Sequence, residues 1–381
     1  MDNETIGKLK KYGVFLMVMF SLWGCKQIRK VTDIIVQPTA RELYAREFQG
    51  IDTVRLNAWQ TEFQKAKNDS LSINLPYVET GSFFKNRNLV YSYQAALKEG
   101  SMLRISTKNE VLGMRSFLDV YKRNKDSTYT LIKENAVGEN ELEFLIEESG
   151  IYTLFIQPEI GATGEFEHQI VTLPSFAFPV VGKDNSAIQS YWGAVRDGGA
   201  RSHEGVDIFA TRGTPVIAVT EGRVSATGNK GLGGKQVWLR TGIFGKSLYY
   251  AHLDTVLTRT GTKVSVGDTL GLVGNTGNAR TTAPHLHFGI YESGRGAINP
   301  LPFIKRADIP RGQDIDSIAP NGQVTAAVAN LRNAPTLKSF IIGEASKNDT
   351  LTVLGITEQW AHIETKNGIK AFIHRNLIAA P

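Results

Sequence analysis

Glycine is concentrated in one part of this sequence, and that concentration restricts the fold more than any other feature. Residues 180–300 hold 21 of the 37 glycines of the 381-residue chain. Such density is typical of tight turns between short strands, because glycine adopts backbone angles that other residues avoid. Short apolar-rich runs lie between these glycines, most clearly at 215–219, 235–239, 247–252 and 285–290. We therefore predict an all-β domain of antiparallel hairpins at residues 176–305.

The preceding segment, residues 70–175, consists of short runs with a period of two. The runs at 71–75 and 91–93 alternate apolar and polar residues, and the run at 151–156 follows Gly150 as a half-buried strand would. Several such runs, separated by glycine, asparagine and serine, predict an antiparallel β-sandwich of roughly 100 residues. His168 is isolated in this segment, and a surface or structural role is expected for it.

Three further segments complete the predicted organisation of a mainly β chain. Residues 25–69 mix charged and aromatic residues, including Trp59 and Phe63, and are expected to be a linker and a helical segment. Residues 306–321 contain Pro310 and Pro320 and are expected to be a linker. Residues 322–381 form a last β module, in which Asn367-Gly368 between two alternating runs predicts a hairpin.

The N-terminal residues have the pattern of an export signal. Lysines at positions 8, 10 and 11 precede an apolar run at 12–23, which is short for a bilayer span but suits a signal-peptide core. The run ends before Cys25 and resembles a bacterial lipoprotein signal, although Trp23 stands where a small residue is usual. This resemblance implies removal of residues 1–24 and lipidation of Cys25. The alternative is a plain secretory signal, or an uncleaved anchor, with an incidental cysteine.

Cys25 is also the only cysteine, which excludes an internal disulfide framework and any cysteine-rich metal site. A metal in this protein must therefore be held by histidines and carboxylates. The net charge of +6 is spread along the chain. It supports attraction to anionic polymers only weakly, and no nucleic-acid partner is predicted.

Four of the seven histidines lie between residues 203 and 287, in three separate runs. His203 and Asp207 are four positions apart at the start of an expected strand, so both side chains can reach one ion. His285 and His287 share one strand face, with Cα atoms about 6.5–7 Å apart. That span suits one metal ligand beside one catalytic base.

These runs, in this order, resemble the lysostaphin/LytM-type zinc metallopeptidases. The resemblance covers residues 200–300 and is carried by His203-Glu204-Gly205-Val206-Asp207, Tyr249-Tyr250-Ala251-His252 and His285-Leu286-His287. Connecting runs such as Gly213-Thr214-Pro215-Val216 also fit. Three separated runs make the resemblance specific, although Ala283 and Gly289 depart from residues that are usual in the family. We expect these departures to affect loop shape and substrate preference rather than catalysis.

The resemblance implies that His203, Asp207 and His287 bind zinc and that His252 and His285 are the catalytic histidines. Three protein ligands leave a fourth coordination position open, as in catalytic zinc sites. A neutral imidazole can take a proton and return it to a leaving amine, and a second can stabilise an oxyanion. The sequence does not assign these two roles between His252 and His285. Glu204 is expected to face away from the metal, and Trp238 is a candidate for either the groove or the core.

The last module resembles a bacterial SH3-like domain. The matching runs are 329–335, 350–354, 359–363 and 371–374, with Ala371-Phe372 where the family usually has Gly-Trp or Gly-Phe. The resemblance implies a small barrel that binds cell-wall peptide, and a structural clip is the alternative. For the β-sandwich we keep three alternatives, namely glycan binding, a cover over the active site, and a spacer.

The resemblance to lysostaphin/LytM-type peptidases, behind an export signal, implies a zinc-dependent endopeptidase that hydrolyses peptide bonds in the stem peptides or cross-bridges of peptidoglycan. Its expected location is the cell envelope, outside the cytoplasm, anchored to a membrane by lipid on Cys25. The alternative function is a non-catalytic envelope scaffold or amidase activator that uses the same groove for binding.

Overall fold

The computed structural model describes residues 38–312 and 320–380, apart from residues 125, 127, 243 and 244. The expected signal peptide, Cys25 and residues 313–319 of the expected linker lie outside the described residues. The prediction of a mainly β protein is confirmed. No helix in the described ranges is both long and apolar enough to cross a membrane.

Two helices lie at the N-terminal end of the described chain, α2 (Ala40–Phe48) and α3 (Thr53–Ala66). Thr39 and Glu42 form a capping box at the start of α2, and Asp52 caps α3. Both helices bury aromatic side chains, including Trp59, against the β-sandwich. Within that contact, the guanidinium of Arg41 lies 2.6 Å from the carboxylate of Asp119.

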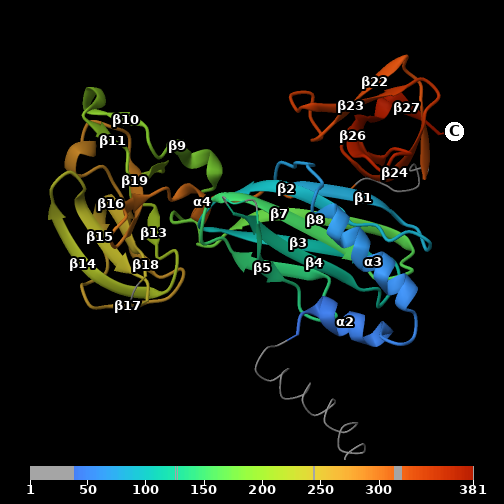
Figure 1. The fold of residues 1–381 in the computed structure, drawn as a ribbon. Helices are drawn as coiled ribbons and strands as arrows, with labels where there is room; N and C mark the ends of the chain where they lie inside the picture. Colours follow the sequence, from blue (N-terminus) through green and yellow to red (C-terminus); the bar gives the residue numbers. More distant parts are fainter. Residues whose placement is uncertain (1–37, 125, 127, 243–244, 313–319, 381) are drawn as a thin grey trace, which may run out of the picture.

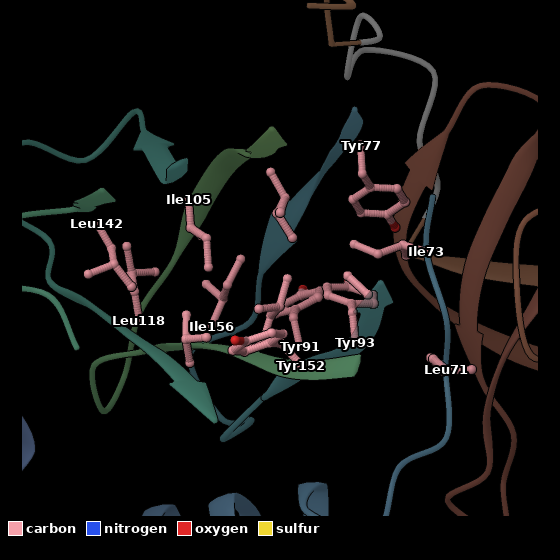
Figure 2. Close-up of a cluster of buried hydrophobic side chains, with 14 of the residues drawn as sticks. Leu71, Ile73, Tyr77, Tyr91, Tyr93, Ile105, Leu118, Leu142, Tyr152 and Ile156 are labelled. Carbon is pink, nitrogen blue, oxygen red and sulfur yellow. The ribbon is translucent and has the colours of Figure 1, made fainter. Parts of the chain in front are cut away.

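The strands that follow form the two layers of a β-sandwich. One layer has the order β1-β8-β3-β6 and the other β2-β7-β4-β5. Their bounds are β1 (Tyr77–Phe83), β2 (Tyr91–Leu97), β3 (Ser101–Asn109), β4 (Ser116–Arg123), β5 (Tyr129–Glu134), β6 (Glu141–Leu145), β7 (Gly150–Pro158) and β8 (Gly164–Pro174). Figure 2 shows side chains of both layers meeting in the core, with Ile105 of β3 near Leu118 of β4 and Ile156 of β7. The alternating sequence pattern places these apolar residues on the inner faces.

His168 belongs to this core, so the surface role that the sequence left open for it is excluded. The ring is fully buried on β8, where it stacks on Phe166 with ring centroids 4.1 Å apart. Its Nδ1 atom lies 3.1 Å from the Thr107 hydroxyl. Burial lowers the pKa of His168 to about 3, so the buried imidazole is neutral at physiological pH.

The glycine-rich segment forms a second β unit around its own apolar core. The main sheet has the order β17-β14-β15-β16-β19-β12-β9. The strands of this unit are β9 (Ile188–Ser190), β10 (Val195–Arg196), β11 (Arg201–Ser202), β12 (Val206–Phe209), β13 (Pro215–Ile217), β14 (Gly222–Lys230), β15 (Gly234–Arg240), β16 (Ser247–Val256), β17 (Lys263–Val264), β18 (Thr269–Val273), β19 (His285–Glu292) and β20 (Gly296–Ile298). Short 3₁₀ turns occur at η1 (Asn185–Ala187), η2 (Asp197–Gly199) and η3 (Gly277–Ala279), and α4 (Leu301–Ile304) follows β20.

The C-terminal module is joined to the sandwich by a shared β-sheet, which the sequence did not predict. Its elements are β21 (Asn321–Val324), β22 (Val328–Arg332), β23 (Ile341–Ser346), β24 (Thr350–Thr357), β25 (Trp360–Glu364), β26 (Lys370–His374), η5 (Arg375–Leu377) and β27 (Ile378–Ala379). β24 pairs with β1 through Thr80 and Ile356, which produces one sheet of 11 strands. Trp360 and Phe372 of the module pack into the sandwich core.

A buried polar cluster lies at this joint. The carboxylate of Glu79 on β1 lies 3.0 Å from Nδ1 of His362 on β25 and accepts hydrogen bonds from the Tyr77 and Tyr93 hydroxyls. Both Glu79 and His362 are fully buried. Burial alone raises the pKa of Glu79, but the interaction with His362 and the hydrogen bonds from the two tyrosines outweigh burial and lower it. The C-terminal module is therefore held against the sandwich by specific buried contacts.

The β9–β20 unit and the C-terminal module lie at opposite ends of the sandwich (Figure 1). The sandwich contacts the β9–β20 unit through the turn between β2 and β3. There Glu99 pairs with Arg295 at 2.9 Å, and Phe303 of α4 packs closely over Gly100. A Cβ atom at Gly100 would lie only 2.2 Å from the Phe303 ring, so this contact requires glycine.

Candidate active site

Asp207 and His287 face each other on neighbouring antiparallel strands. Asp207 on β12 is the register partner of His287 on β19. His203 lies just before β12, which begins at Val206, so it is not on the strand as the sequence pattern suggested. Gly205 lets the chain turn back close to β19, since a Cβ atom there would lie 2.6 Å from the His287 ring. The local fold thus brings His203 to the same point as Asp207 and His287.

The three side chains present a compact set of donor atoms. His203 Nε2 and His287 Nδ1 each lie 3.0 Å from Asp207 Oδ1, and the two nitrogens lie 3.0 Å from each other. Ligand atoms of a tetrahedral zinc ion, with bonds of about 2.0–2.1 Å, are separated by about 3.3 Å. Two imidazoles and one carboxylate are also the ligand types that zinc accepts in catalytic sites. Within the described ranges this is the one group of histidine, cysteine and acidic side chains that could hold a metal ion.

Neighbouring groups orient these donors. His203 Nδ1 lies 2.9 Å from the backbone carbonyl of Tyr191, to which an Nδ1–H donates, and this leaves the Nε2 lone pair directed at the cluster. Arg196, on the hairpin of β10 and β11, donates to the other oxygen of Asp207 at 2.6 Å and to the Ser190 hydroxyl at 2.6 Å. Burial alone raises the pKa of Asp207, but the contacts of its carboxylate with His203 and His287 outweigh burial and hold it far below its usual range. Asp207 is therefore an ionised carboxylate.

His252 and His285 form a second pair beside this cluster, with ring centroids 5.0 Å apart. Each Nδ1 lies 2.9 Å from a backbone carbonyl, that of Thr276 for His252 and that of Ala283 for His285. When Nδ1 donates to these carbonyls, Nε2 of each ring is left as the group available to a ligand. Burial lowers the pKa of His252 to about 4, so its imidazole is neutral at neutral pH.

The backbone at His252 is in a conformation that few residues with a side chain adopt. Its φ angle is 63°, in the left-handed region. The His252 amide donates to the Gly233 carbonyl at 2.8 Å, which helps to hold this conformation. Backbone strain of this kind costs on the order of 1–3 kcal/mol and is concentrated at functional sites.

All five predicted site residues line one open groove of about 1200 Å³. The residues that line it lie between Gln189 and Tyr291, so neither the sandwich nor the C-terminal module contributes to its walls within the described part of the chain. The structure therefore gives no support to the sandwich as a cover over this site. Trp238, for which the sequence left the groove and the core as alternatives, lines the groove.

Sequence reasoning missed several groove residues. Arg196 contacts the candidate ligand Asp207, yet no motif marks it, because its position depends on how the β10–β11 hairpin folds back. Glu204 does lie away from the three donor atoms but still lines the groove, where it accepts a hydrogen bond from Tyr291 at 3.3 Å. Tyr291 was also missed, although its even spacing from His285 and His287 on one strand could have indicated the shared face.

Comparison with known families agrees with this geometry. Residues 201–300 match the model of peptidase family M23. This segment is a peptidase family M23 domain. Members of the family are zinc metallopeptidases, which fits the His-Asp-His donor set of the M23 domain. Residues 327–379 match a bacterial SH3 domain, so the predicted SH3-like fold of the last module is confirmed.

Curated relatives match the M23 domain and its surroundings. The L-Ala--D-Glu endopeptidase of Bacillus subtilis (strain 168) is 35% identical over 146 residues, which is 35% of this chain and 44% of that protein. The glycyl-glycine endopeptidase ALE-1 of Staphylococcus capitis is 37% identical over 111 residues, which is 28% of this chain and 30% of that protein. The chain thus spans less than half the length of these relatives.

A solved structure also matches the M23 domain. The catalytic domain of lysostaphin from Staphylococcus simulans is 34% identical, the match covers 30% of this chain and 87% of that one, and the TM-score is 0.27.

Proposed function

We propose that this protein is a zinc-dependent endopeptidase that hydrolyses peptide bonds in the stem peptides or cross-bridges of peptidoglycan. The observation that carries the proposal is the meeting of two groups in one open groove. These are the donor atoms of His203, Asp207 and His287, and the paired imidazoles of His252 and His285. The names of the endopeptidase relatives support the substrate class.

His203 Nε2, Asp207 Oδ1 and His287 Nδ1 would hold the zinc ion. Zinc bound there supplies a Lewis acid that polarises the scissile carbonyl group. Arg196 and the Tyr191 carbonyl keep the ligand atoms in place through their hydrogen bonds to Asp207 and His203. These contacts reduce the reorganisation that binding of the ion requires.

His252 and His285 would carry the proton transfers. One Nε2 atom accepts the proton of the attacking water and returns it to the leaving amine. The other Nε2 atom donates to the oxyanion only from a ring that is protonated on both nitrogens, because its Nδ1–H already donates to a backbone carbonyl. Because both Nδ1 atoms are directed at backbone carbonyls, each ring presents the same nitrogen to the substrate. The contacts therefore treat the two histidines alike, and only a ring protonated on both nitrogens can act as the donor.

Digestion of purified peptidoglycan sacculi tests the proposal directly. The full chain should contain about one zinc ion and release soluble muropeptides, which mass spectrometry assigns to stem or cross-bridge cleavage. Asp207→Ala should abolish release. Asp308→Ala is the matched control, since Asp308 is exposed and lies outside the groove. Digestion by the Asp207→Ala variant at the wild-type rate would refute the proposal.

A non-catalytic scaffold or amidase activator remains the alternative function. The same groove would then bind a partner rather than cleave a peptide. A reaction that contains only sacculi and this protein separates the two functions. Release that stops on chelation and returns on addition of zinc supports the endopeptidase, whereas no release under any condition supports the alternative.

We also propose that the protein acts in the cell envelope, held to a membrane by lipid on Cys25. The support is the N-terminal pattern, in which the only cysteine follows a short apolar run. Metabolic labelling with a radioactive fatty acid tests this location. Label that is present in the wild type and lost in Cys25→Ser supports lipidation, and equal labelling of both contradicts it.

A further inference from the structure

We infer that one end of the groove binds an ammonium-bearing side chain of the substrate peptide, and this inference rests on the proposed function. The site is formed by the rings of Trp238, Tyr249 and Tyr291 together with the carboxylate of Glu204, and we call it the aromatic-acidic subsite. All four residues line the groove. None of them belongs to the predicted ligand or catalytic set.

Strand register places this subsite on the same sheet face as the candidate metal ligands. Trp238 on β15 is the register partner of Tyr249 on β16, and Tyr249 is the partner of Gly289 on β19. Tyr291 follows His287 by four residues on β19, which corresponds to about 13 Å of extended strand. An extended peptide with its scissile bond near His287 therefore reaches the subsite with a side chain a few residues away.

Gly289 keeps the space between the rings open. It lies on β19 between His287 and Tyr291. A Cβ atom there would lie 3.1 Å from both the Tyr291 ring and the Glu204 carbonyl oxygen. A larger side chain would displace the ring or the loop that carries Glu204.

The three rings form a packed aromatic surface. Trp238 stacks on Tyr249 with centroids 4.3 Å apart, and Tyr291 lies 5.2 Å from Trp238 and nearly perpendicular to Tyr249. All three side chains are partly exposed. Ring faces attract cations through the negative face of the π system, most strongly for tryptophan. An ammonium group is thus favoured over a neutral amide at this surface.

Glu204 adds a formal negative charge beside the rings. Its carboxylate is exposed and accepts a hydrogen bond from the Tyr291 hydroxyl at 3.3 Å, and no other side chain in the described ranges pairs with it. Burial, followed by the charge of Glu204, raises the pKa of Tyr291 well above its usual value, so the hydroxyl remains a donor. One carboxylate oxygen is therefore held in place while the other is free for an ammonium ligand.

The basic residues of the groove lie on other elements. Arg196 and Arg201 are on the β10–β11 hairpin, and Lys230 ends β14. Arg196 is engaged by Asp207. The carboxylate that contacts the aromatic surface is that of Glu204, through its hydrogen bond with Tyr291.

Binding of two matched peptides tests the subsite. The probes are the tetrapeptide L-Ala-D-Glu-L-Lys-D-Ala and the same peptide acetylated on the lysine side chain. Calorimetry measures Kd on the full chain with His285→Ala, so that the probes stay intact. We expect the free amine to bind about fivefold more tightly, from one cation–π contact and one exposed ion pair. Adding Glu204→Gln should reduce this ratio to about twofold or less.

The ratio of the two Kd values also defines the control and the results that would contradict the inference. Glu221→Gln removes an exposed carboxylate of the M23 domain that lies outside the groove, and it should leave the fivefold ratio unchanged. Equal Kd values for the two probes, or a preference that survives Glu204→Gln, would overturn the inference. Failure of the unmodified enzyme to cleave sacculi would count against the endopeptidase alone, because the Kd ratio does not depend on cleavage.

Discussion

Arg196 donates to one carboxylate oxygen of Asp207 at 2.6 Å, while the other oxygen of Asp207 lies 3.0 Å from both His203 Nε2 and His287 Nδ1. The two oxygens are therefore divided between a positioning contact and the candidate metal site. Arg196 also bonds the Ser190 hydroxyl, which fixes its guanidinium against β9. This arrangement determines which carboxylate oxygen faces the ligand cluster.

Substitution of Arg196 should therefore weaken zinc binding. We expect Arg196→Gln to lower zinc affinity by about 10–100-fold, since loss of a group that orients a ligand typically has an effect of this size. Competition with a fluorescent chelator measures the affinity. Arg259→Gln, at an exposed arginine outside the groove, should bind zinc like the wild type. An unchanged affinity in Arg196→Gln would show that Asp207 needs no such support.

The two histidine pairs should separate metal binding from catalysis. His252→Gln or His285→Gln should lower muropeptide release by about 10²–10⁴-fold, the usual contribution of a general acid or base, with zinc content unchanged. His287→Gln should lose zinc as well. Zinc content is measured by mass spectrometry on the same preparations. The roles proposed here would be wrong if His252→Gln released zinc and His287→Gln retained it.

His168 should make the folded protein sensitive to moderate acid. Its pKa is about 3 in the folded state and about 6.5 when exposed, so the unfolded chain binds one more proton between these values. The free energy of unfolding should then fall by about 1.4 kcal/mol per pH unit as pH drops from 6.5 towards 3.

Urea unfolding at several pH values tests this sensitivity. His168→Asn removes the titrating ring but retains a group that can bond Thr107. The variant should be less stable at neutral pH, because it loses the packing against Phe166, but its pH slope should be shallower. A slope equal to that of the wild type would show that His168 does not control acid stability.

The joint between the sandwich and the C-terminal module should depend on Glu79. Glu79→Gln removes the negative charge and leaves one acceptor oxygen, in place of two, for His362 and the two tyrosine hydroxyls of the buried cluster. A buried polar group that loses a hydrogen-bond partner costs about 1–3 kcal/mol, which should appear as lower stability in urea. Glu143→Gln breaks the exposed pair with Arg104 and should change stability by less than about 1 kcal/mol. Similar effects of the two substitutions would argue against a specific role for the buried cluster.

The predicted ligand set came from the resemblance of three short runs to the metallopeptidase family, and the local geometry of these runs is compatible with it. Strand periodicity places His285 and His287 on one face, and the four-residue spacing allows His203 and Asp207 to converge. The start of β12 was less predictable. His203 precedes the strand, and it reaches the cluster because Gly205 permits close approach to His287.

Contacts between segments far apart in the chain were not predictable in the same way. Arg196 meets Asp207 only after the β10–β11 hairpin folds over β12. Glu79 and His362 are 283 positions apart, and each looks like an ordinary polar residue in its own run. No local pattern indicates that both will be fully buried, because burial depends on which strand pairs with β1.

The sequence by itself determined the mainly β class, the M23 and SH3-type regions and the five candidate site residues. Hydrophobic periodicity, glycine content and motif spacing are local properties of the chain. The tertiary structure alone decided three further points. It placed the groove clear of the sandwich, joined β24 to β1 in one sheet, and gathered Glu204 with three aromatic rings beside the site. These arrangements depend on packing and strand pairing between segments that are far apart in the chain. The residues that stabilise them do not occur together in any short stretch of sequence.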